Sequence, residues 1–240
     1  IMYHLPVMLK ECIEGLNINP EGIYVDVTFG GGGHSREILS RLGATGKLIA
    51  FDQDIDAKRN NIEDNRFVLI EENFRHIGRF LKFYGVKKVD GILADLGVSS
   101  HQFDEAERGF STRFDGELDM RMNQTQELTA EVILNEYSFN DLVYYFSRYG
   151  EDSNAKYIAR KIEKYRETKR IETTFELVDI IKSALPQKVL SKKGHPAKKI
   201  FQALRIAVND ELRVFEDSLK QALELLNKDG RVVVITFHSL

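Results

Sequence analysis

The chain has 240 residues, a formal net charge of −3 and 42% hydrophobic residues, the composition of an ordinary globular protein. No apolar run approaches the roughly 18 to 20 residues that span a bilayer, and no signal peptide opens the chain. The single cysteine, Cys12, cannot form an internal disulfide, and its apolar surroundings favour a packed core thiol. These features predict a soluble, cytoplasmic protein with no membrane segment.

Charge is distributed unevenly along the chain. Residues 148–206 contain 15 Lys and Arg against 7 Asp and Glu, which leaves 19 of the 34 basic and 30 of the 37 acidic residues elsewhere. Such a split can give one face a field that attracts a polyanion, although a solvated helical surface has the same composition.

The first hundred residues alternate short apolar runs with helical patterns. The apolar runs predict strands at 23–27, 47–52, 66–70 and 89–96. Helical spacing of apolar residues predicts helices at 35–42 and 74–84, each followed by a glycine. Strands that alternate with helices predict βαβ units and a parallel sheet with right-handed crossovers.

The alternation breaks after Leu96. A charged, irregular stretch precedes three helical patterns at 138–149, 154–166 and from 173 or 174 to about 185. A linker, one long helix and a final strand follow at 191–196, 198–226 and 231–237. We therefore predict an α/β fold with a doubly wound, mainly parallel sheet and an inserted all-helical domain at 101–199, with 1–100 and 200–240 forming the sheet domain. Because such a sheet rarely ends just past a strand, we expect the natural protein to continue beyond Leu240.

A glycine cluster, Gly30 to Gly33, joins the first predicted strand to the first predicted helix. Consecutive glycines let the backbone turn tightly and approach a ligand, and a helix N-terminus offers free N–H groups. Asp52, 19 residues beyond Gly33 at the end of the second strand, can accept hydrogen bonds from both hydroxyls of a ribose. The pattern predicts an adenosine pocket, although a glycine run also occurs in plain turns.

Two cofactor classes share this geometry. A dinucleotide site prefers G-x-G-x-x-G, but the third glycine position holds Arg36 or Ser35, depending on where the pattern starts. Asp26, near the end of the first apolar run, adds a carboxylate for an aminoacyl ammonium group. The sequence therefore favours S-adenosyl-L-methionine over NAD, and an NAD-dependent dehydrogenase is the alternative.

The fourth strand ends at Asp95, followed by Ser99 and Ser100. In an open α/β sheet the reacting groups collect at the carboxyl ends of the strands. A carboxylate that accepts a hydrogen from an exocyclic amine such as cytosine N4 can align the nitrogen and localise its electron density. Asp95 is our main catalytic candidate and the two serines are secondary candidates. Alternatively, Asp95 only caps the following helix.

Three groups of residues are candidates for substrate or metal binding. Phe237 and His238 end the last strand on the same edge, where a ring can stack on a flipped-out base or simply pack in the core. Arg121, Lys198 and Lys199 are candidates for phosphate contacts, although a solvated surface is the more common role of any one lysine. The six histidines show no metal-ligand spacing, so we predict no catalytic metal.

Many short segments resemble, in order along nearly the whole chain, the bacterial small-subunit (16S) rRNA cytosine-N4 methyltransferase family, RsmH or MraW. They are His4-Leu-Pro-Val-Met, Thr28-Phe-Gly-Gly-Gly-Gly-His-Ser, Asp90-Gly-Ile-Leu-Ala-Asp-Leu-Gly-Val-Ser-Ser, Asp104-Glu-Ala-Glu-Arg-Gly-Phe-Ser, Leu118-Asp-Met-Arg-Met, His195-Pro-Ala, Phe201-Gln-Ala-Leu-Arg-Ile, Val208-Asn-Asp-Glu-Leu and Phe237-His-Ser-Leu.

The resemblance implies a class I, Rossmann-like methyltransferase domain with an inserted helical domain for RNA recognition. The implied activity is methylation of N4 of a cytidine in the decoding region of 16S rRNA, as naked RNA or in the assembled small subunit. The implied cofactor contacts are Gly32, Gly33, His34, Asp52, Phe74, Asp95 and Gln102, of which Phe74 and Gln102 rest on the resemblance alone. A non-catalytic RNA-binding or assembly factor is a further alternative. Monomer and homodimer both stay open.

The chain departs from the family at two points. Members usually have Pro-Ala-Thr-Arg-Thr-Phe-Gln where this chain has Pro196-Ala-Lys-Lys-Ile-Phe-Gln, and the added charge still suits RNA. Members also continue past Phe-His-Ser-Leu.

Overall fold

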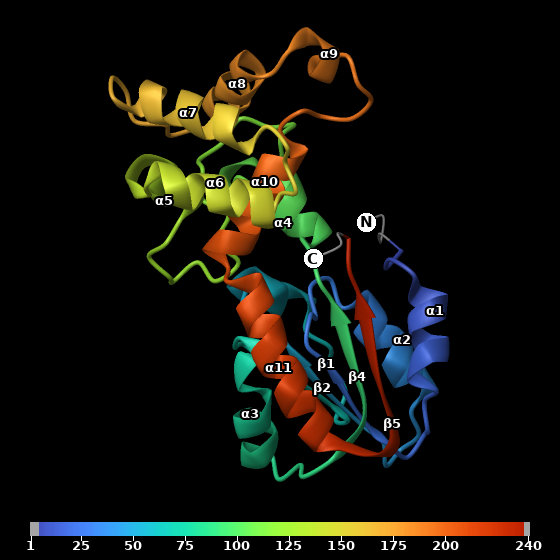
Figure 1. The fold of residues 1–240 in the computed structure, drawn as a ribbon. Helices are drawn as coiled ribbons and strands as arrows, with labels where there is room; N and C mark the ends of the chain where they lie inside the picture. The colour runs from blue at the N-terminus through green and yellow to red at the C-terminus, as the bar shows by residue number, and fades with distance from the viewer. Residues whose placement is uncertain (1–4, 238–240) are drawn as a thin grey trace. The chain divides into compact units, whose positions relative to one another are not determined.

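The computed structural model describes residues 5–237, which form two compact units (Figure 1). Within the described residues, the first unit comprises 5–100 and 212–237 and the second comprises 101–211. The first unit contains the sheet, and the second is mainly helical.

The first unit is built on a five-stranded sheet of order β3-β2-β1-β4-β5, in which all neighbouring pairs are parallel. The strands are β1 (Ile23–Asp26), β2 (Lys47–Phe51), β3 (Phe67–Ile70), β4 (Val89–Asp95) and β5 (Leu226–Ile235). The predicted α/β fold class is confirmed. Four strands match their predicted ranges closely, whereas β5 begins five residues before the predicted start at 231.

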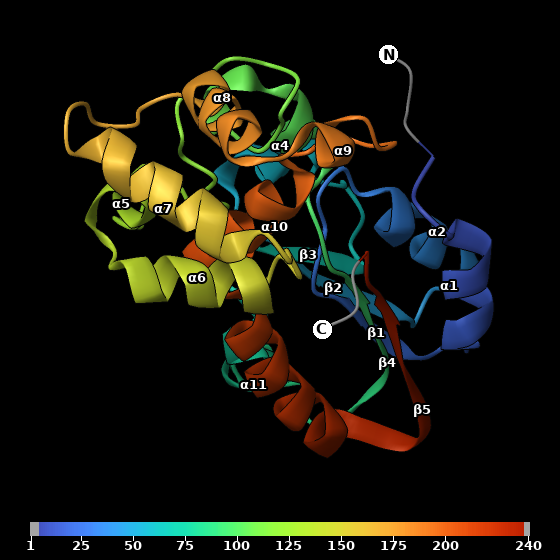
Figure 2. The ribbon, with the colours of Figure 1, turned by 45° about the horizontal axis from the view of Figure 1, so that its top comes forward.

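Alternate strand residues are buried in two separate cores, one on each face of the sheet. Tyr24, Leu48 and Leu93 pack with residues of α1 (Leu9–Leu16) and α2 (Gly33–Arg41), and Cys12 is buried in this core. Val25, Ile49 and Ile92 pack on the other face with α3 (Ile77–Phe83) and α11 (Glu211–Leu225). Burial on both faces explains the nearly continuous apolar runs of these strands, and Figure 2 shows helices on each side.

The second unit contains α5 (Ala130–Glu136), α6 (Phe139–Arg148), α7 (Ala155–Arg166), α8 (Thr174–Ala184), α9 (Gln187–Leu190) and α10 (Lys198–Val208), and α4 (Ser100–Asp104) begins at its boundary. The hydroxyls of Thr129, Ser138 and Thr173 accept hydrogen bonds from the first turns of α5, α6 and α8, which fixes where these helices start. Short 3₁₀ segments occur at Ile55–Asn60, Phe74–His76 and Ala106–Arg108. The predicted helices at 138–149 and 154–166, and the one beginning at 173 or 174, are confirmed.

The prediction of one long helix at 198–226 is wrong. The chain breaks between α10 and α11 at Asn209 and Asp210, and Asp210 has a left-handed φ of 50°. The Asn209 amide donates to the carbonyls of Met120 and Arg205 and its oxygen accepts from the Met122 N–H, so this side chain ties the end of α10 to a loop. Apolar periodicity alone does not reveal such a break.

The break also moves the boundary of the helical unit. We predicted that residues from 200 onward belong with the sheet, but residues 200–211 cluster with the helices. The buried face of α10, which includes Ile200, Phe201 and Leu204, packs against α5 and α6. The helical unit therefore extends to Glu211.

Candidate functional site

The predicted site residues of the first unit follow the carboxyl ends of parallel strands. The glycine loop follows β1, Asp52 follows β2 and Asp95 ends β4. Because β1 lies between β2 and β4, the chain leaves β1 towards one side of the sheet order and later returns on the other. Such a switch point is where open α/β sheets bind their ligands.

Hydrogen bonds hold the glycine loop in one conformation. Gly30 and Gly32 have left-handed φ values of 51° and 78°, which residues with a Cβ rarely adopt. The carbonyl of Gly31 accepts from Arg36 Nη1 at 2.8 Å, and that of Gly30 accepts from Asn60 Nδ2 at 3.1 Å. A Cβ added at Gly31 would meet no atom within 4 Å, so this glycine presents an open face of the loop.

The segment before α1 packs on the same loop. A Cβ at Gly33 would lie 2.2 Å from Cγ of Pro6. His34 is buried, and its Nε2 lies 2.9 Å from the carbonyl oxygen of Val7. Since a carbonyl only accepts, Nε2 carries a proton. Sequence reasoning gave Pro6 and Val7 no role. They belong to the His4-Leu-Pro-Val-Met segment, the one sequence feature that singled them out.

Asp52 is a partly exposed carboxylate held in a fixed orientation. One oxygen accepts from the Gly30 N–H at 2.8 Å and the other from the Asp54 N–H at 2.9 Å. Burial is the main cause that raises the pKa of Asp52 to about 6, against these two hydrogen bonds. Each oxygen keeps a second lone pair. A fixed carboxylate beside an open glycine loop fits the ribose of an adenosyl group.

Asp26 differs from what its sequence position suggested. It is 1% exposed, and its carboxylate accepts from the Ser35 hydroxyl at 2.6 Å and from the Thr28 N–H at 3.0 Å. Burial raises its pKa. Asp26 therefore ties α2 to the end of β1 and does not offer a free carboxylate to an ammonium group. Ser35, considered only as a poor substitute for a third glycine, has this unforeseen structural role.

Asp95, unlike Asp26, has an accessible carboxylate. Its side chain is 24% exposed, and Oδ2 lies 3.9 Å from Nδ1 of His34. Its backbone N–H donates to the Thr28 hydroxyl at 2.7 Å, which joins the end of β4 to the loop after β1. Desolvation raises the pKa of Asp95, Asp26 raises it further, and His34 opposes both. Asp95 can accept hydrogen bonds from a bound molecule.

The other predicted residues at this edge are placed as follows. Ser99 lies beside the glycine loop, since a Cβ at Gly30 would be 3.6 Å from its Cβ, whereas Ser100 is exposed at the start of α4. The ring of Phe237 lies 3.0 Å from a Cβ built at Gly97, just after β4, and Phe237 is 55% exposed. Phe237 is therefore not packed in the core, which was the alternative to a role in stacking on a base. His238 lies outside the described residues.

Phe74 and Gln102, expected from resemblance alone, lie in different units. Phe74 is partly buried in the segment after β3, and its neighbour Asn73 donates to Gln53, the residue after Asp52, at 3.1 Å. This bond brings Phe74 to the same part of the sheet edge as Asp52. Gln102 is buried in α4.

The three basic candidates in the helical unit are not equally available. Arg121 forms two hydrogen bonds to the Asp119 carboxylate, both at 2.8 Å, and one to the Gln126 carbonyl. Lys199 donates to the Glu151 carbonyl at 3.1 Å, whereas Lys198 is exposed at the start of α10. Arg121 therefore organises its own loop.

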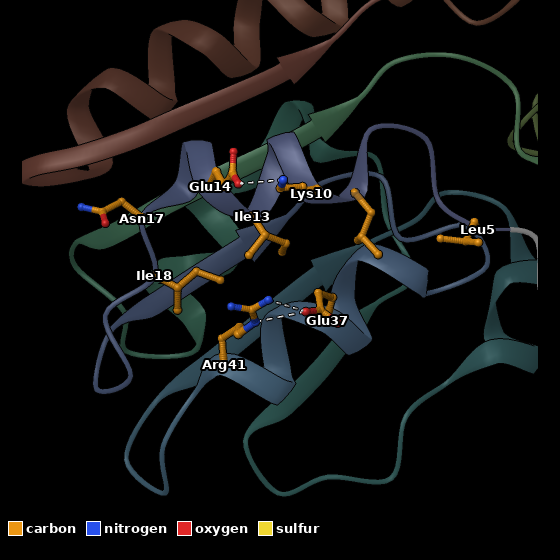
Figure 3. Close-up of a pocket in the computed structure, with 9 residues that line it drawn as sticks. Leu5, Lys10, Ile13, Glu14, Asn17, Ile18, Glu37 and Arg41 are labelled. Carbon is orange, nitrogen blue, oxygen red and sulfur yellow. Dashed lines mark hydrogen bonds and ion pairs between the residues drawn. The ribbon is translucent and has the colours of Figure 1, made fainter.

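A separate groove of about 720 Å³ lies between α1 and α2 (Figure 3). It has an apolar floor that includes Ile13 and Ile18, with the Lys10–Glu14 and Arg41–Glu37 pairs at its rim. None of the predicted site residues lines it. In residues 5–237 no group of three or more His, Cys, Asp or Glu is arranged to hold a metal ion, and no helix is both long and apolar enough to cross a membrane.

A parallel sheet with a rigid glycine loop after β1 and carboxylates after β2 and at the end of β4 defines a cofactor-binding α/β enzyme of the class I methyltransferase type. Residues 1–240 match the model of the MraW methylase family, and the chain belongs to that family.

The chain is similar to proteins named ribosomal RNA small subunit methyltransferase H. It is 57% identical to that of Flavobacterium johnsoniae over 238 residues, and 55% identical to that of Christiangramia forsetii over 238 residues. The identity to that of Leuconostoc mesenteroides is 57% over 244 residues. Each comparison covers 99% of this chain and 78% of the relative.

Proposed function

We propose that the protein transfers a methyl group from S-adenosyl-L-methionine to N4 of a cytidine in the decoding region of 16S rRNA. The observation that carries this proposal is Asp95, whose carboxylate is partly exposed and whose backbone N–H donates to the Thr28 hydroxyl and so joins the residue to the segment before the glycine loop. The names of the relatives support a small-subunit rRNA substrate.

Residues that would bind and orient the cofactor are Gly32, Gly33, His34 and Asp52. The cofactor would supply a methyl group on a sulfonium sulfur, which departs as a neutral thioether. The rigid loop admits the adenosyl group closely, and Asp52 accepts from the ribose hydroxyls through lone pairs that its backbone bonds leave free. Phe74, near Asp52, packs against the adenine.

Asp95 accepts a hydrogen bond from N4 of the cytosine. N4 is a weak nucleophile because its lone pair is delocalised into the ring, and an acceptor on one N4 hydrogen localises that density and fixes the line of attack. The nitrogen loses one proton when the N–C bond forms, and a carboxylate with a raised pKa is suited to receive it. Ser99 and Ser100 are secondary candidates for holding the base, and Phe237 and His238 for stacking on it.

The helical unit recognises the RNA around the target nucleotide, through Lys198 and Lys199 and not through Arg121, and the enzyme acts in the cytoplasm. Contacts to phosphate position such a complex without reading sequence.

The test is incubation of the protein with labelled cofactor and under-methylated small subunits or naked 16S rRNA, followed by mapping of the modified nucleotide. The proposal predicts one labelled cytidine, modified at N4. A label on another base or another position contradicts it. Complete absence of transfer, with the cofactor product S-adenosylhomocysteine still bound, favours a non-catalytic assembly factor.

A further inference from the structure

The helix α7 has the largest excess of basic residues among the helices of residues 5–237. It has five basic residues against one acidic residue, whereas α10 has three against none, α11 two against four and α8 one against two. On α1, α2 and α11, ion pairs four residues apart neutralise basic side chains.

Four of the five basic residues of α7 lie on one side of the helix, whereas Arg166 lies outside this side and donates to the Leu134 carbonyl. At 100° per residue, an arc of about 140° holds five exposed residues, namely Lys156, Tyr157, Arg160, Lys161 and Lys164. The opposite side buries Ala155, Ile158, Ala159 and Ile162. It packs against α6 and α8, beside which α7 lies in Figures 1 and 2. The core of the unit thus fixes which face of α7 points to solvent.

Most of the charge on this face is not neutralised. Lys156, Lys161 and Lys164 form no ion pair with any residue in 5–237, and all three are exposed. Arg160 is the exception, because it pairs with Glu163 at 2.6 Å and its guanidinium lies 4.1 Å from the ring centroid of Phe139. The Phe139 contact holds Arg160 on the surface.

An aromatic side chain stands within this basic face. Tyr157 is 68% exposed and lies between the lysines on the helical wheel. Unpaired lysines around an exposed ring form the combination that binds a nucleic-acid backbone and stacks on an unpaired base or a sugar. An acidic protein surface is the other class of partner for such a face, and the rRNA substrate of the proposed function favours RNA.

We propose that this face of α7, defined by Lys156, Tyr157, Lys161 and Lys164, is an RNA-backbone contact surface that anchors the ribosomal RNA. The inference rests on the proposed function for the identity of the RNA. It adds a surface whose contribution is electrostatic and independent of sequence, and which sets affinity for the substrate without altering the chemical step.

The first test replaces Lys156, Lys161 and Lys164 with glutamine, which keeps helix propensity. The matched control replaces Lys47, Lys82 and Lys87, which are also exposed and unpaired but belong to the sheet unit. With small subunits as substrate, the α7 variant raises KM at least tenfold, whereas kcat and the affinity for S-adenosylhomocysteine stay within twofold of the wild type. The slope of log Kd for subunits against log salt becomes shallower by about 2 to 3. The control variant leaves KM and the salt slope unchanged.

The second test identifies the partner by cross-linking. Cys12 is the one cysteine of the chain, and burial is the main cause that raises its pKa to about 11, so a cysteine placed on the surface is labelled selectively. A Lys161→Cys variant that carries an aryl azide is irradiated on small subunits, with Lys87→Cys as control. Cross-links from position 161 to rRNA support the proposal.

Two results overturn the inference. One is an α7 variant with wild-type KM and salt slope. The other is cross-linking from position 161 to ribosomal proteins alone, which identifies a protein partner. Failure of the proposed function looks different, because the wild type then transfers no methyl group while the salt slope and the cross-link still report on α7.

Discussion

Two carboxylates at the same edge of the sheet, Asp26 and Asp95, have different environments and hence different roles. Ser35 and Thr28 donate to Asp26, which is buried, whereas the Asp95 side chain keeps 24% of its surface exposed. A buried, bonded carboxylate stabilises the loop, and an accessible one can accept a hydrogen from a ligand. Only the structure separates the two, because both follow apolar runs in the sequence.

The role of Asp95 is tested with Asp95→Ala and Asp95→Asn. If Asp95 positions N4, kcat for methyl transfer to small subunits falls about 100-fold or more in Asp95→Ala. Affinity for S-adenosylhomocysteine, measured by calorimetry, then falls much less than kcat. A loss of affinity as large as the loss of kcat assigns Asp95 to cofactor binding alone. Undiminished methyl transfer removes it from the site.

The raised pKa of Asp52 predicts a pH dependence of cofactor binding. The pKa of Asp52 is about 6, so at a pH below 6 its side chain is mostly protonated. The protonated carboxyl is a weaker acceptor for the ribose hydroxyls. The Kd of S-adenosylhomocysteine therefore rises as pH falls through 6, by about tenfold at pH 5 if the protonated form does not bind. Calorimetry between pH 5 and 7.5 measures this change.

Asp52→Asn is the control for this effect. It weakens binding at neutral pH and removes the rise in Kd below pH 6. An unchanged pH profile in Asp52→Asn assigns the titration to another group, such as Asp95.

At the scale of elements, the glycine loop and the segment before α1 form one assembly. Gly33→Ala forces Cβ against Pro6, whose Cγ is 2.2 Å away, so the segment must shift and the His34–Val7 contact is lost. We expect the free energy of unfolding to fall by about 1–3 kcal/mol. Chemical denaturation measures the change.

Gly31→Ala is the matched variant, because its Cβ meets nothing within 4 Å. Its stability stays within about 0.5 kcal/mol of the wild type. Its affinity for S-adenosylhomocysteine nevertheless falls if the cofactor lies against this open face. Equal stabilities of the two variants contradict the packing of Pro6 on Gly33.

The break between α10 and α11 depends on the side chain of Asn209. Asn209→Ala leaves the Met122 N–H and the Met120 carbonyl without this partner in a buried region, and we expect a loss of about 2–4 kcal/mol in unfolding free energy. Asn61→Ala removes an exposed local hydrogen bond to Ile62 and serves as control, with a change within about 0.5 kcal/mol. Comparable effects of the two substitutions contradict the assigned role of Asn209.

The strands and several helices were predictable because their signals are local. Period-two burial on both faces makes β1, β2 and β4 continuous apolar runs, and Thr173 and Ser138 mark helix starts. The break at Asn209 was not predictable, since its cause is a contact with residues 120 and 122, nearly ninety positions away. The packing of Pro6 on Gly33 is equally non-local.

At the scale of the molecule, the excess of positive charge is confined to residues 148–206, which are part of the helical unit. The sequence predicted a basic region at 148–206, and the structure adds that within it Arg166 and Arg205 are engaged internally while one face of α7 is not. Composition does not distinguish basic residues that are bonded within the protein from those that are exposed and unpaired. Burial and pairing are needed to separate structural arginines from lysines available to a polyanion.

The placement of the candidate site residues at the sheet edge was predictable in part, because the signals of the strand ends are local. Gly30 to Gly33, Asp52 and Asp95 were found from strand ends, whose neighbours in a parallel sheet follow from topology. The free or engaged state of Asp26, Asp95 and Arg121 was not, because it depends on hydrogen bonds between side chains.

The central claim is that an adenosyl cofactor lies over the glycine loop with its ribose on Asp52, and a crystal structure with bound S-adenosylhomocysteine tests it most directly. The account predicts both ribose hydroxyls within hydrogen-bond distance of the Asp52 carboxylate and the sulfur on the side of Asp95. Ligand density elsewhere, with none beside the glycine loop and Asp52, would contradict it.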